Sequence, residues 1–212
     1  MHSITHLEIE VFMSLINYAK KEIICKIVYY GPGRSGKTTN LQYIFSKIPV
    51  EKRGEMTSLA TEMDRTLFFD FLPFDVGKIG NFTAKFQLYT VPGQVYYDST
   101  RKLVLQGADG VVFVIDSQAD RMEDNIESFE NLAVNLKENG FSINTMPLVI
   151  QYNKRDLPNA SDTNVIKSML QIRDEWKTFE TIAIKGMGVI ETLKSAMFIV
   201  INQLTRKYDR KR

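Results

Sequence analysis

The residues Gly31-Pro32-Gly33-Arg34-Ser35-Gly36-Lys37-Thr38 are the strongest indication of fold class in this 212-residue chain. They match the pattern G-x-x-x-x-G-K-[ST] and lie between a predicted strand at 23–30 and a predicted helix at about 37–47. Glycines let such a loop curl so that its amides face phosphate oxygens, and the helix start adds the positive end of its dipole. The flanking strand and the complete spacing disfavour the alternative, a chance glycine turn before a helix. The stretch predicts a site for a nucleoside triphosphate or diphosphate.

The chemistry of the loop assigns roles to its side chains. Lys37 would neutralise the β- and γ-phosphates, and the Thr38 hydroxyl would bind Mg²⁺. The predicted phosphate-binding residues are Gly31, Gly33, Arg34, Ser35, Gly36, Lys37, Thr38 and Thr39.

Strand-like and helix-like stretches alternate beyond the loop. Predicted strands at 66–72 and 82–89 flank a turn region at 73–81 and should form a hairpin. The apolar stretch at 110–116 predicts a strand covered on both faces, and 121–139 has apolar residues at helical spacing before Gly140. Further predicted elements are strands at 148–152 and 179–184 and helices at 162–174 and 189–206. This order predicts an α/β P-loop NTPase fold with a mostly parallel six-to-seven-stranded sheet and helices on both faces.

Composition excludes several classes of protein. A net charge of +2 is too small to indicate nucleic acid as a partner. The single cysteine, Cys25, excludes a disulfide framework within the chain, and we expect it to be a reduced core thiol. The two histidines, His2 and His6, lie at the N-terminus, which excludes histidine-based catalysis in the body of the chain. No apolar run approaches the about 18 residues of a membrane span, so we expect a cytoplasmic protein without an integral membrane segment.

A second motif indicates which base is bound. Asn153-Lys154-Arg155-Asp156 directly follows the predicted strand at 148–152. The Asp156 carboxylate can accept hydrogen bonds from N1–H and the exocyclic amine of guanine, whereas adenine offers no such pair of donors. Asn153 and Lys154 would brace the ring and the loop, and the Ala183 amide could meet the guanine carbonyl. N-K-x-D alone is commonly a polar turn, but after a P-loop and at a strand end it predicts guanine binding.

Together these motifs resemble the small Ras-like GTPases, and in particular the bacterial mutual gliding protein A (MglA) family. The resemblance covers residues 13–206, which we interpret as one small GTPase domain. Residues 1–12 would be an N-terminal extension or the product of a misassigned start codon, and 207–212 a basic tail. The stretches that carry the resemblance are KIVYYGPGRSGKTTNLQY at 26–43, SLATEMDRTLFFDFL at 58–72, YTVPGQVYY at 89–97 and QYNKRDLPNA at 151–160.

The resemblance places Thr90-Val91-Pro92-Gly93-Gln94 where Ras-like proteins carry D-x-x-G-Q. It implies that the Gly93 amide meets the γ-phosphate and that Gln94 orients the attacking water. Thr90 departs from the pattern, because an acid at that position usually supports Mg²⁺ through water. MglA proteins resemble this chain in having threonine there. Asp70 and Asp116 are both candidates for the missing acid, and Asp116 could instead cap a helix.

The same resemblance makes Thr66 the switch threonine that closes on Mg²⁺, so that Thr38 and Thr66 are the predicted metal ligands. Arg65 would be an arginine finger that stabilises transition-state charge, the alternative being a solvated loop arginine. The predicted catalytic residues are Gln94, Arg65 and Lys37. We also expect any side chain at Gly33 to intrude on this site, so that Gly33→Val binds nucleotide without hydrolysing it.

The family implies a GTPase, slow alone, that switches between GTP and GDP and controls polarity in bacteria that glide or use type IV pili. Its implied partners are a roadblock-fold activator (MglB-like), an exchange factor and motility effectors, and we expect a monomer on its own, recruited to a cell pole through partners. The family also implies a register shift of the strand after the switch, which Gly77 and Gly80 would permit. The alternatives are a non-hydrolysing scaffold, which Thr90 would suggest, and a P-loop kinase, for which we find no acceptor-binding segment.

Overall fold

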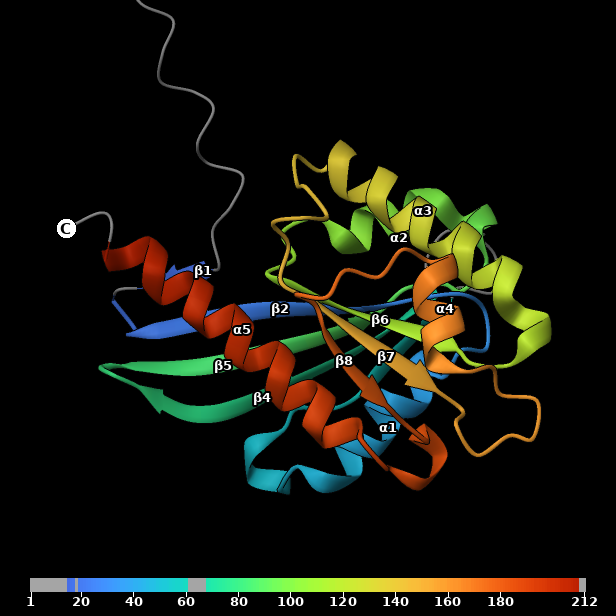
Figure 1. Ribbon diagram of the computed structural model, residues 1–212. Helices are drawn as coiled ribbons and strands as arrows, with labels where there is room; N and C mark the ends of the chain where they lie inside the picture. The colour runs from blue at the N-terminus through green and yellow to red at the C-terminus, as the bar shows by residue number, and fades with distance from the viewer. Residues whose placement is uncertain (1–14, 18, 61–67, 210–212) are drawn as a thin grey trace, which may run out of the picture.

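The computed structural model of this chain describes residues 15–17, 19–60 and 68–209 (Figure 1). At its centre is one sheet with seven strands in the order β3-β4-β5-β2-β6-β7-β8, and β1 pairs with β2 beside this path. The strands are β1 (Leu15–Asn17), β2 (Glu22–Tyr30), β3 (Thr57–Ala60), β4 (Phe68–Ile79), β5 (Phe82–Thr90), β6 (Gly110–Asp116), β7 (Leu148–Asn153) and β8 (Lys177–Glu180). The five strands from β5 to β8 along the path are parallel, whereas β4 is antiparallel to both of its neighbours.

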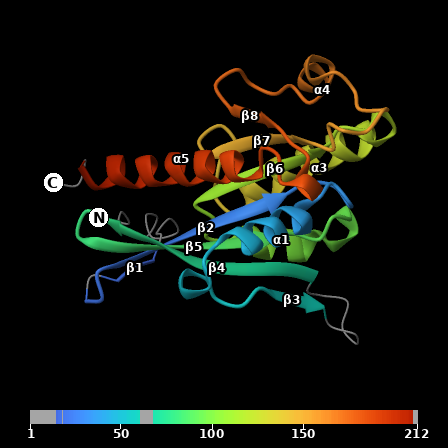
Figure 2. The ribbon, with the colours of Figure 1, turned by 90° about the horizontal axis from the view of Figure 1, so that it is seen from below.

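Helices cover both faces of the sheet, as Figures 1 and 2 show. Apolar side chains of α1 and α5 join one core cluster, and those of α2, α3 and α4 join a second cluster on the opposite face. The predicted fold class is therefore confirmed. The helices are α1 (Lys37–Lys47), α2 (Asp98–Leu105), α3 (Met122–Glu138), α4 (Thr163–Met169) and α5 (Val189–Asp209).

The surroundings of the inner strand β6 explain why its sequence is apolar throughout. Val111, Phe113 and Ile115 contribute to the cluster under α2 and α3, and the alternate residues Val112 and Val114 contribute to the cluster under α1 and α5. All seven residues of β6 are buried. Because successive side chains of a strand point to opposite faces, a strand covered on both sides needs apolar residues at every position.

Three of the predicted boundaries were wrong. The first strand of the hairpin does not end before Pro73 but runs to Ile79, so that only Gly80 and Asn81 separate β4 from β5. The strand predicted at 179–184 is β8, which ends at Glu180, and Ala183 lies in a following 3-10 turn. The helix predicted at 162–174 ends at Met169, followed by the left-handed residue Gln171.

Three further differences concern two short strands of the sheet and the last helix. The sequence did not predict β1 or β3, which are three and four residues long. The last helix continues through 207–209, so α5 includes half of the predicted basic tail. The other half, like residues 1–12, lies outside the described residues.

The parallel topology gathers the predicted motifs at one edge. β2 ends at Tyr30 immediately before the glycine-rich loop, β6 ends at Asp116, and β7 ends at Asn153. In sheets of this kind ligands bind at the carboxyl ends of the strands. The fold therefore brings together segments that lie more than 100 residues apart.

Candidate functional site

The glycines of the phosphate loop are required by backbone conformation and by close contacts. Gly31 and Gly36 have φ of +141° and +103°, a region that side chains disfavour. A Cβ on Gly36 would lie 2.2 Å from Asn153 Nδ2, and one on Gly31 would lie 2.2 Å from the Val114 carbonyl oxygen. Arg34 also has positive φ, at +63°. The loop is thus held in a tight curl against the ends of β6 and β7.

Lys37 is buried beneath this loop, with 6% of its surface exposed. Its Nζ donates to the carbonyls of Gly31 at 2.9 Å and Pro32 at 2.6 Å. Burial, and to a smaller extent the Arg101 charge, lower the pKa of Lys37 to about 7, although the Asp70 carboxylate opposes the shift. A phosphate group would give this buried ammonium a strong counter-charge, so the residue fits its predicted role.

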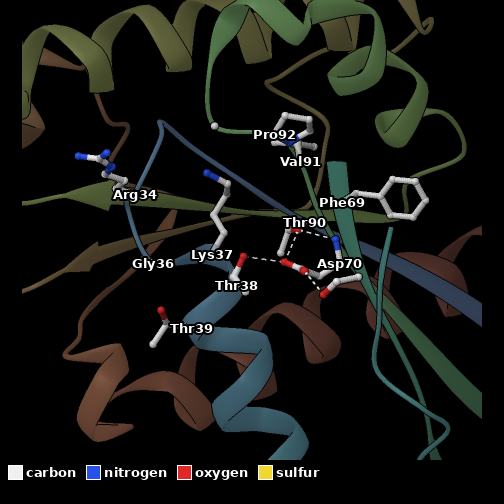
Figure 3. A pocket seen from close by; sticks show the side chains of 12 residues that line it. Arg34, Gly36, Lys37, Thr38, Thr39, Phe69, Asp70, Thr90, Val91 and Pro92 are labelled. Carbon is white, nitrogen blue, oxygen red and sulfur yellow. Dashed lines mark hydrogen bonds between the residues drawn. The ribbon is translucent and has the colours of Figure 1, made fainter. Parts of the chain in front are cut away.

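Asp70 lies at the centre of a cluster of oxygen atoms at the start of α1 (Figure 3). Its Oδ2 accepts hydrogen bonds from Thr38 Oγ1 at 2.6 Å and Thr90 Oγ1 at 2.8 Å, and its Oδ1 accepts one from Ser58 Oγ at 2.7 Å. Its backbone N–H donates to Thr90 Oγ1 at 2.8 Å. Thr90 therefore fixes a carboxylate that comes from the neighbouring strand β4.

This cluster fits Mg²⁺, which prefers hard oxygen ligands such as hydroxyl and carboxylate groups. Of the two candidate acids, Asp70 hydrogen-bonds the predicted ligand Thr38, whereas Asp116 accepts from Lys154 Nζ at 2.6 Å on the side of the base motif. The Asp116 backbone also exchanges two hydrogen bonds with the Asn125 side chain. The geometry favours Asp70 as the acid that supports the metal.

The base motif and the phosphate loop share one side chain. Asn153 Nδ2 donates to the Ser35 carbonyl at 2.7 Å, and its Oδ1 accepts from the Ala183 N–H at 2.9 Å and from Thr181 Oγ1 at 3.1 Å. The Ala183 N–H therefore already has a partner. Its predicted contact with a guanine carbonyl stays a prediction that requires this hydrogen bond to be shared or exchanged.

Asp156 lies beside a residue that the sequence did not single out as functional. Lys185 Nζ is 3.2 Å from Asp156 Oδ2. Lys185 comes from the short turn after β8, whose Gly186 has φ +76° and packs against Tyr43 of α1, since a Cβ there would lie 1.8 Å from Tyr43 Cζ. In the sequence, the signal for the close contact with Tyr43 was Gly186 itself, which follows the end of the predicted strand at 179–184 by two residues.

The segment after β5 lies against the phosphate loop. A Cβ on Gly93 would lie 2.2 Å from Gly33 Cα, whereas a Cβ on Gly33 would meet nothing nearer than the Gly93 carbonyl carbon at 3.9 Å. A single methyl at Gly33 would thus meet only ordinary van der Waals contact in this conformation, and its expected intrusion on the approach of Gln94 and Arg65 to the γ-phosphate stays a prediction. Gln94 is exposed at the start of a 3-10 turn, where its carbonyl accepts from the Tyr97 N–H.

A pocket of about 530 Å³ opens between these segments. Figure 3 shows Lys37 and Thr38 on one side, Asp70 and Thr90 beside them, and Arg34 pointing away. Arg65 and Thr66 lie outside the described residues, so their roles stay predictions. The lining residues are Arg34, Gly36, Lys37, Thr38, Thr39, Ser58, Phe69, Asp70, Thr90, Val91, Pro92 and Gly93.

A mostly parallel sheet with a phosphate loop, a carboxylate that hydrogen-bonds the threonine of that loop, and an N-K-x-D loop at one edge defines a small GTPase of the Ras-like class. Residues 9–199 match the model of the ADP-ribosylation factor family. The chain belongs to this family.

Comparison with individual proteins shows which members of this family the chain resembles. It is 56% identical over 194 residues to the mutual gliding-motility protein MglA of Myxococcus xanthus, which covers 92% of this chain and 99% of the relative. It is 29% identical to ADP-ribosylation factor-like protein 2 of Drosophila melanogaster, over 89% of the chain and 91% of that protein. ADP-ribosylation factor-like protein 6 of Caenorhabditis elegans is 27% identical over 85% of this chain and 88% of that protein. The resemblance to the MglA family indicated by the motifs is confirmed.

Within the described ranges, no helix has the length and the apolar character that crossing a bilayer requires.

Proposed function

We propose that this protein is a molecular switch that binds GTP and hydrolyses it to GDP and phosphate. The observation that carries the proposal is the contact of Asp70 with both Thr38 and Thr90. Thr90 was the one departure from the GTPase pattern, and it would suggest a scaffold that has lost catalysis. A carboxylate from β4 beside Thr38 supplies the acid that Thr90 does not, which supports an active enzyme over the scaffold.

Thr38 would hold Mg²⁺ directly, Asp70 would orient the Thr38 hydroxyl and the water around the ion, and Thr66 would join them as the second ligand. When bound, the ion neutralises charge on the β- and γ-phosphates. Lys37 would hold the same phosphates from the loop side. Gln94 would orient the attacking water, and Arg65 would stabilise the charge that develops on the phosphates.

The cellular role follows from the relative named for mutual gliding motility. We propose that this chain controls polarity and movement, by gliding or type IV pili, in the same kind of bacterium. Its hydrolysis would be slow alone and stimulated by a roadblock-fold, MglB-like partner, and an exchange factor and motility effectors would read the two states. The protein would be a monomer in the cytoplasm that reaches a pole through these partners.

The experiment is a displacement and hydrolysis assay on purified protein. GTP and GDP, but not ATP, should displace a fluorescent guanine nucleotide, because Asp156 accepts from two donors that adenine does not offer. Single-turnover hydrolysis should fall about 100-fold in Asp70→Asn, Gln94→Ala and Arg65→Ala. Asp174→Asn is the matched control, because this carboxylate is 93% exposed, pairs with Lys167 of α4 and is not among the residues that line the pocket.

Each outcome separates the proposal from its alternatives. Tight GTP binding without hydrolysis, alone or with a roadblock partner, would support the non-hydrolysing scaffold. Displacement by ATP as effective as displacement by GTP would contradict guanine recognition and favour a P-loop kinase.

A further inference from the structure

We propose that Arg121 is a positioning residue for GTP hydrolysis, which holds the Gly33–Arg34 peptide in the orientation that the phosphates require. This inference rests on the function proposed above. Arg121 lies at the start of α3, 88 residues from Gly33, in none of the motifs that the sequence indicated.

The contact is direct. Arg121 Nη2 donates to the Gly33 carbonyl oxygen at 3.1 Å. The guanidinium is itself held, because Nη1 is 2.7 Å from Asp124 Oδ2 one turn further along α3. Its Nε lies 3.9 Å from Asp116 Oδ2, a carboxylate that is fully buried. Because one close ion pair and a second carboxylate at 3.9 Å already orient this guanidinium, it loses less freedom when it also binds a backbone carbonyl.

The geometry of the peptide bond gives this contact its consequence. In a planar trans peptide the C=O and N–H bonds point in opposite directions. While Arg121 holds the Gly33 carbonyl on its own side, the Arg34 N–H points to the other side. Arg34 has φ +63°, a conformation that a non-glycine residue adopts only where its surroundings enforce it. The hydrogen bond from Arg121 is one such constraint.

The contact also joins the two ends of the nucleotide site. Asp116 accepts from Lys154 Nζ at 2.6 Å on the base side and faces Arg121 on the phosphate side. Gly33 in turn lies against Gly93, the residue predicted to meet the γ-phosphate. Arg121 is thus placed to act on the part of the loop that distinguishes GTP from GDP.

The test compares Arg121→Gln and Arg121→Lys with the wild-type chain. We expect the rate of single-turnover GTP hydrolysis of Arg121→Gln to fall about tenfold, since a charge-assisted hydrogen bond is lost. GDP affinity should change less than about threefold, and Arg121→Lys should recover part of the rate because lysine can still donate to the carbonyl. Arg173→Gln is the control, because Arg173 binds Asn144 and stacks near Trp176 away from the site.

Wild-type hydrolysis by Arg121→Gln would overturn the proposal, as would equal losses of GDP affinity and hydrolysis, which would indicate a general loss of structure. If the wild-type chain itself does not hydrolyse GTP, the proposed function fails but this inference is still tested. In that case Arg121→Gln should weaken the affinity for a non-hydrolysable GTP analogue more than the affinity for GDP, and an unchanged ratio would contradict the positioning role.

Discussion

At the scale of single residues, the apposition of Gly93 and Gly33 sets how closely the switch segment can approach the phosphate loop. The two positions differ sharply in the space around them, 2.2 Å against 3.9 Å for the nearest atom to an added Cβ. Sequence patterns treat both glycines as motif members. Only the structure shows that Gly93, and not Gly33, must lack a side chain for the two backbone segments to lie this close together.

We predict that Gly93→Ala destabilises the nucleotide-free protein by about 1–3 kcal/mol, because its Cβ meets backbone atoms that must shift. Gly33→Ala should stay within about 0.5 kcal/mol of wild type. Gly33→Val should still bind GDP and fail to hydrolyse GTP, because its γ-methyls extend toward Gly93. Urea unfolding and single-turnover hydrolysis measure these effects; equal stability of the two alanine variants would contradict the packing argument.

A second prediction concerns the pH dependence of nucleotide binding. The pKa of Lys37 is about 7 without nucleotide, and bound phosphates favour its protonated form. Affinity for GDP should therefore fall as pH rises above 7, by up to about tenfold per unit. Unfolding shows the opposite sign: the unfolded chain keeps this proton up to a pKa near 10.5, so the nucleotide-free fold gains stability from pH 7 upward.

Titrations of a fluorescent GDP analogue between pH 7 and 9 would check this dependence. Calorimetry in buffers of different ionisation enthalpy should show proton uptake on binding above pH 7. Constant affinity with no proton uptake would mean that Lys37 is already charged.

At the scale of elements, the polar contact between α2 and α3 centres on Arg101, which is fully buried. Its Nη2 donates to Ser128 Oγ at 2.7 Å, and its guanidinium lies 4.3 Å from the centroid of the Tyr30 ring. Two of its nitrogens, Nε and Nη1, are buried without a hydrogen-bond partner in the described structure. A buried cation with unused donors is a weak source of stability.

We predict that Arg101→Met stays within about 1 kcal/mol of wild-type stability, whereas Arg101→Ala loses about 2–5 kcal/mol because it leaves a cavity. Removing the Arg101 charge should also raise the pKa of Lys37, since that charge lowers it. Denaturant unfolding and the pH titration above measure both effects. A loss with methionine as large as that with alanine would show that the charge itself holds α2 in place.

The elements also show what could be read from the sequence. The phosphate-loop motif predicted α1, and helical periodicity and an apolar run predicted α3 and β6 closely, because α3 buries one long face and β6 buries both of its faces. The extent of β4 was missed, since Pro73 and Gly77 read as turn residues although pairing with β5 continues through a bulge between Asp75 and Gly77. Gly77 and Gly80 have positive φ and open space around them, which is compatible with the predicted register shift without testing it.

The sequence predicted the parts of the site that lie within one loop, but not the contacts between residues distant in the chain. Local motifs identified the phosphate loop and Asn153-Lys154-Arg155-Asp156, because their roles depend on spacing within one loop. Asp70 could only be offered beside Asp116, and Arg121 was missed. Their partners are 32 and 88 residues distant in the chain, so only the register of β4 and the packing of α3 bring them together.

At the scale of the whole molecule, the site belongs to the sheet as a unit, because its residues come from β4 and from the ends of β2, β5, β6, β7 and β8 and the loops that follow them. Nucleotide that binds the folded chain alone therefore stabilises all of it. At a concentration 1,000 times its Kd, GDP with Mg²⁺ should add about 4 kcal/mol, or about 8–16 °C in Tm for a domain of this size. Differential scanning calorimetry would measure the shift. A shift with ADP as large as with GDP would contradict guanine selectivity.

The bond between Asn153 and the Ser35 carbonyl has a consequence for how such sequences can diverge. The Asn153 amide occupies the space that a side chain at Gly36 would need. Positions 36 and 153 are therefore jointly constrained, although they belong to separate motifs. A lineage that abandons asparagine at 153 gains room at 36 while losing the tether to Ser35. The φ of +103° still disfavours a side chain at 36, so drift at 153 alone should leave glycine at 36, whereas a side chain at 36 should occur only together with a change at 153.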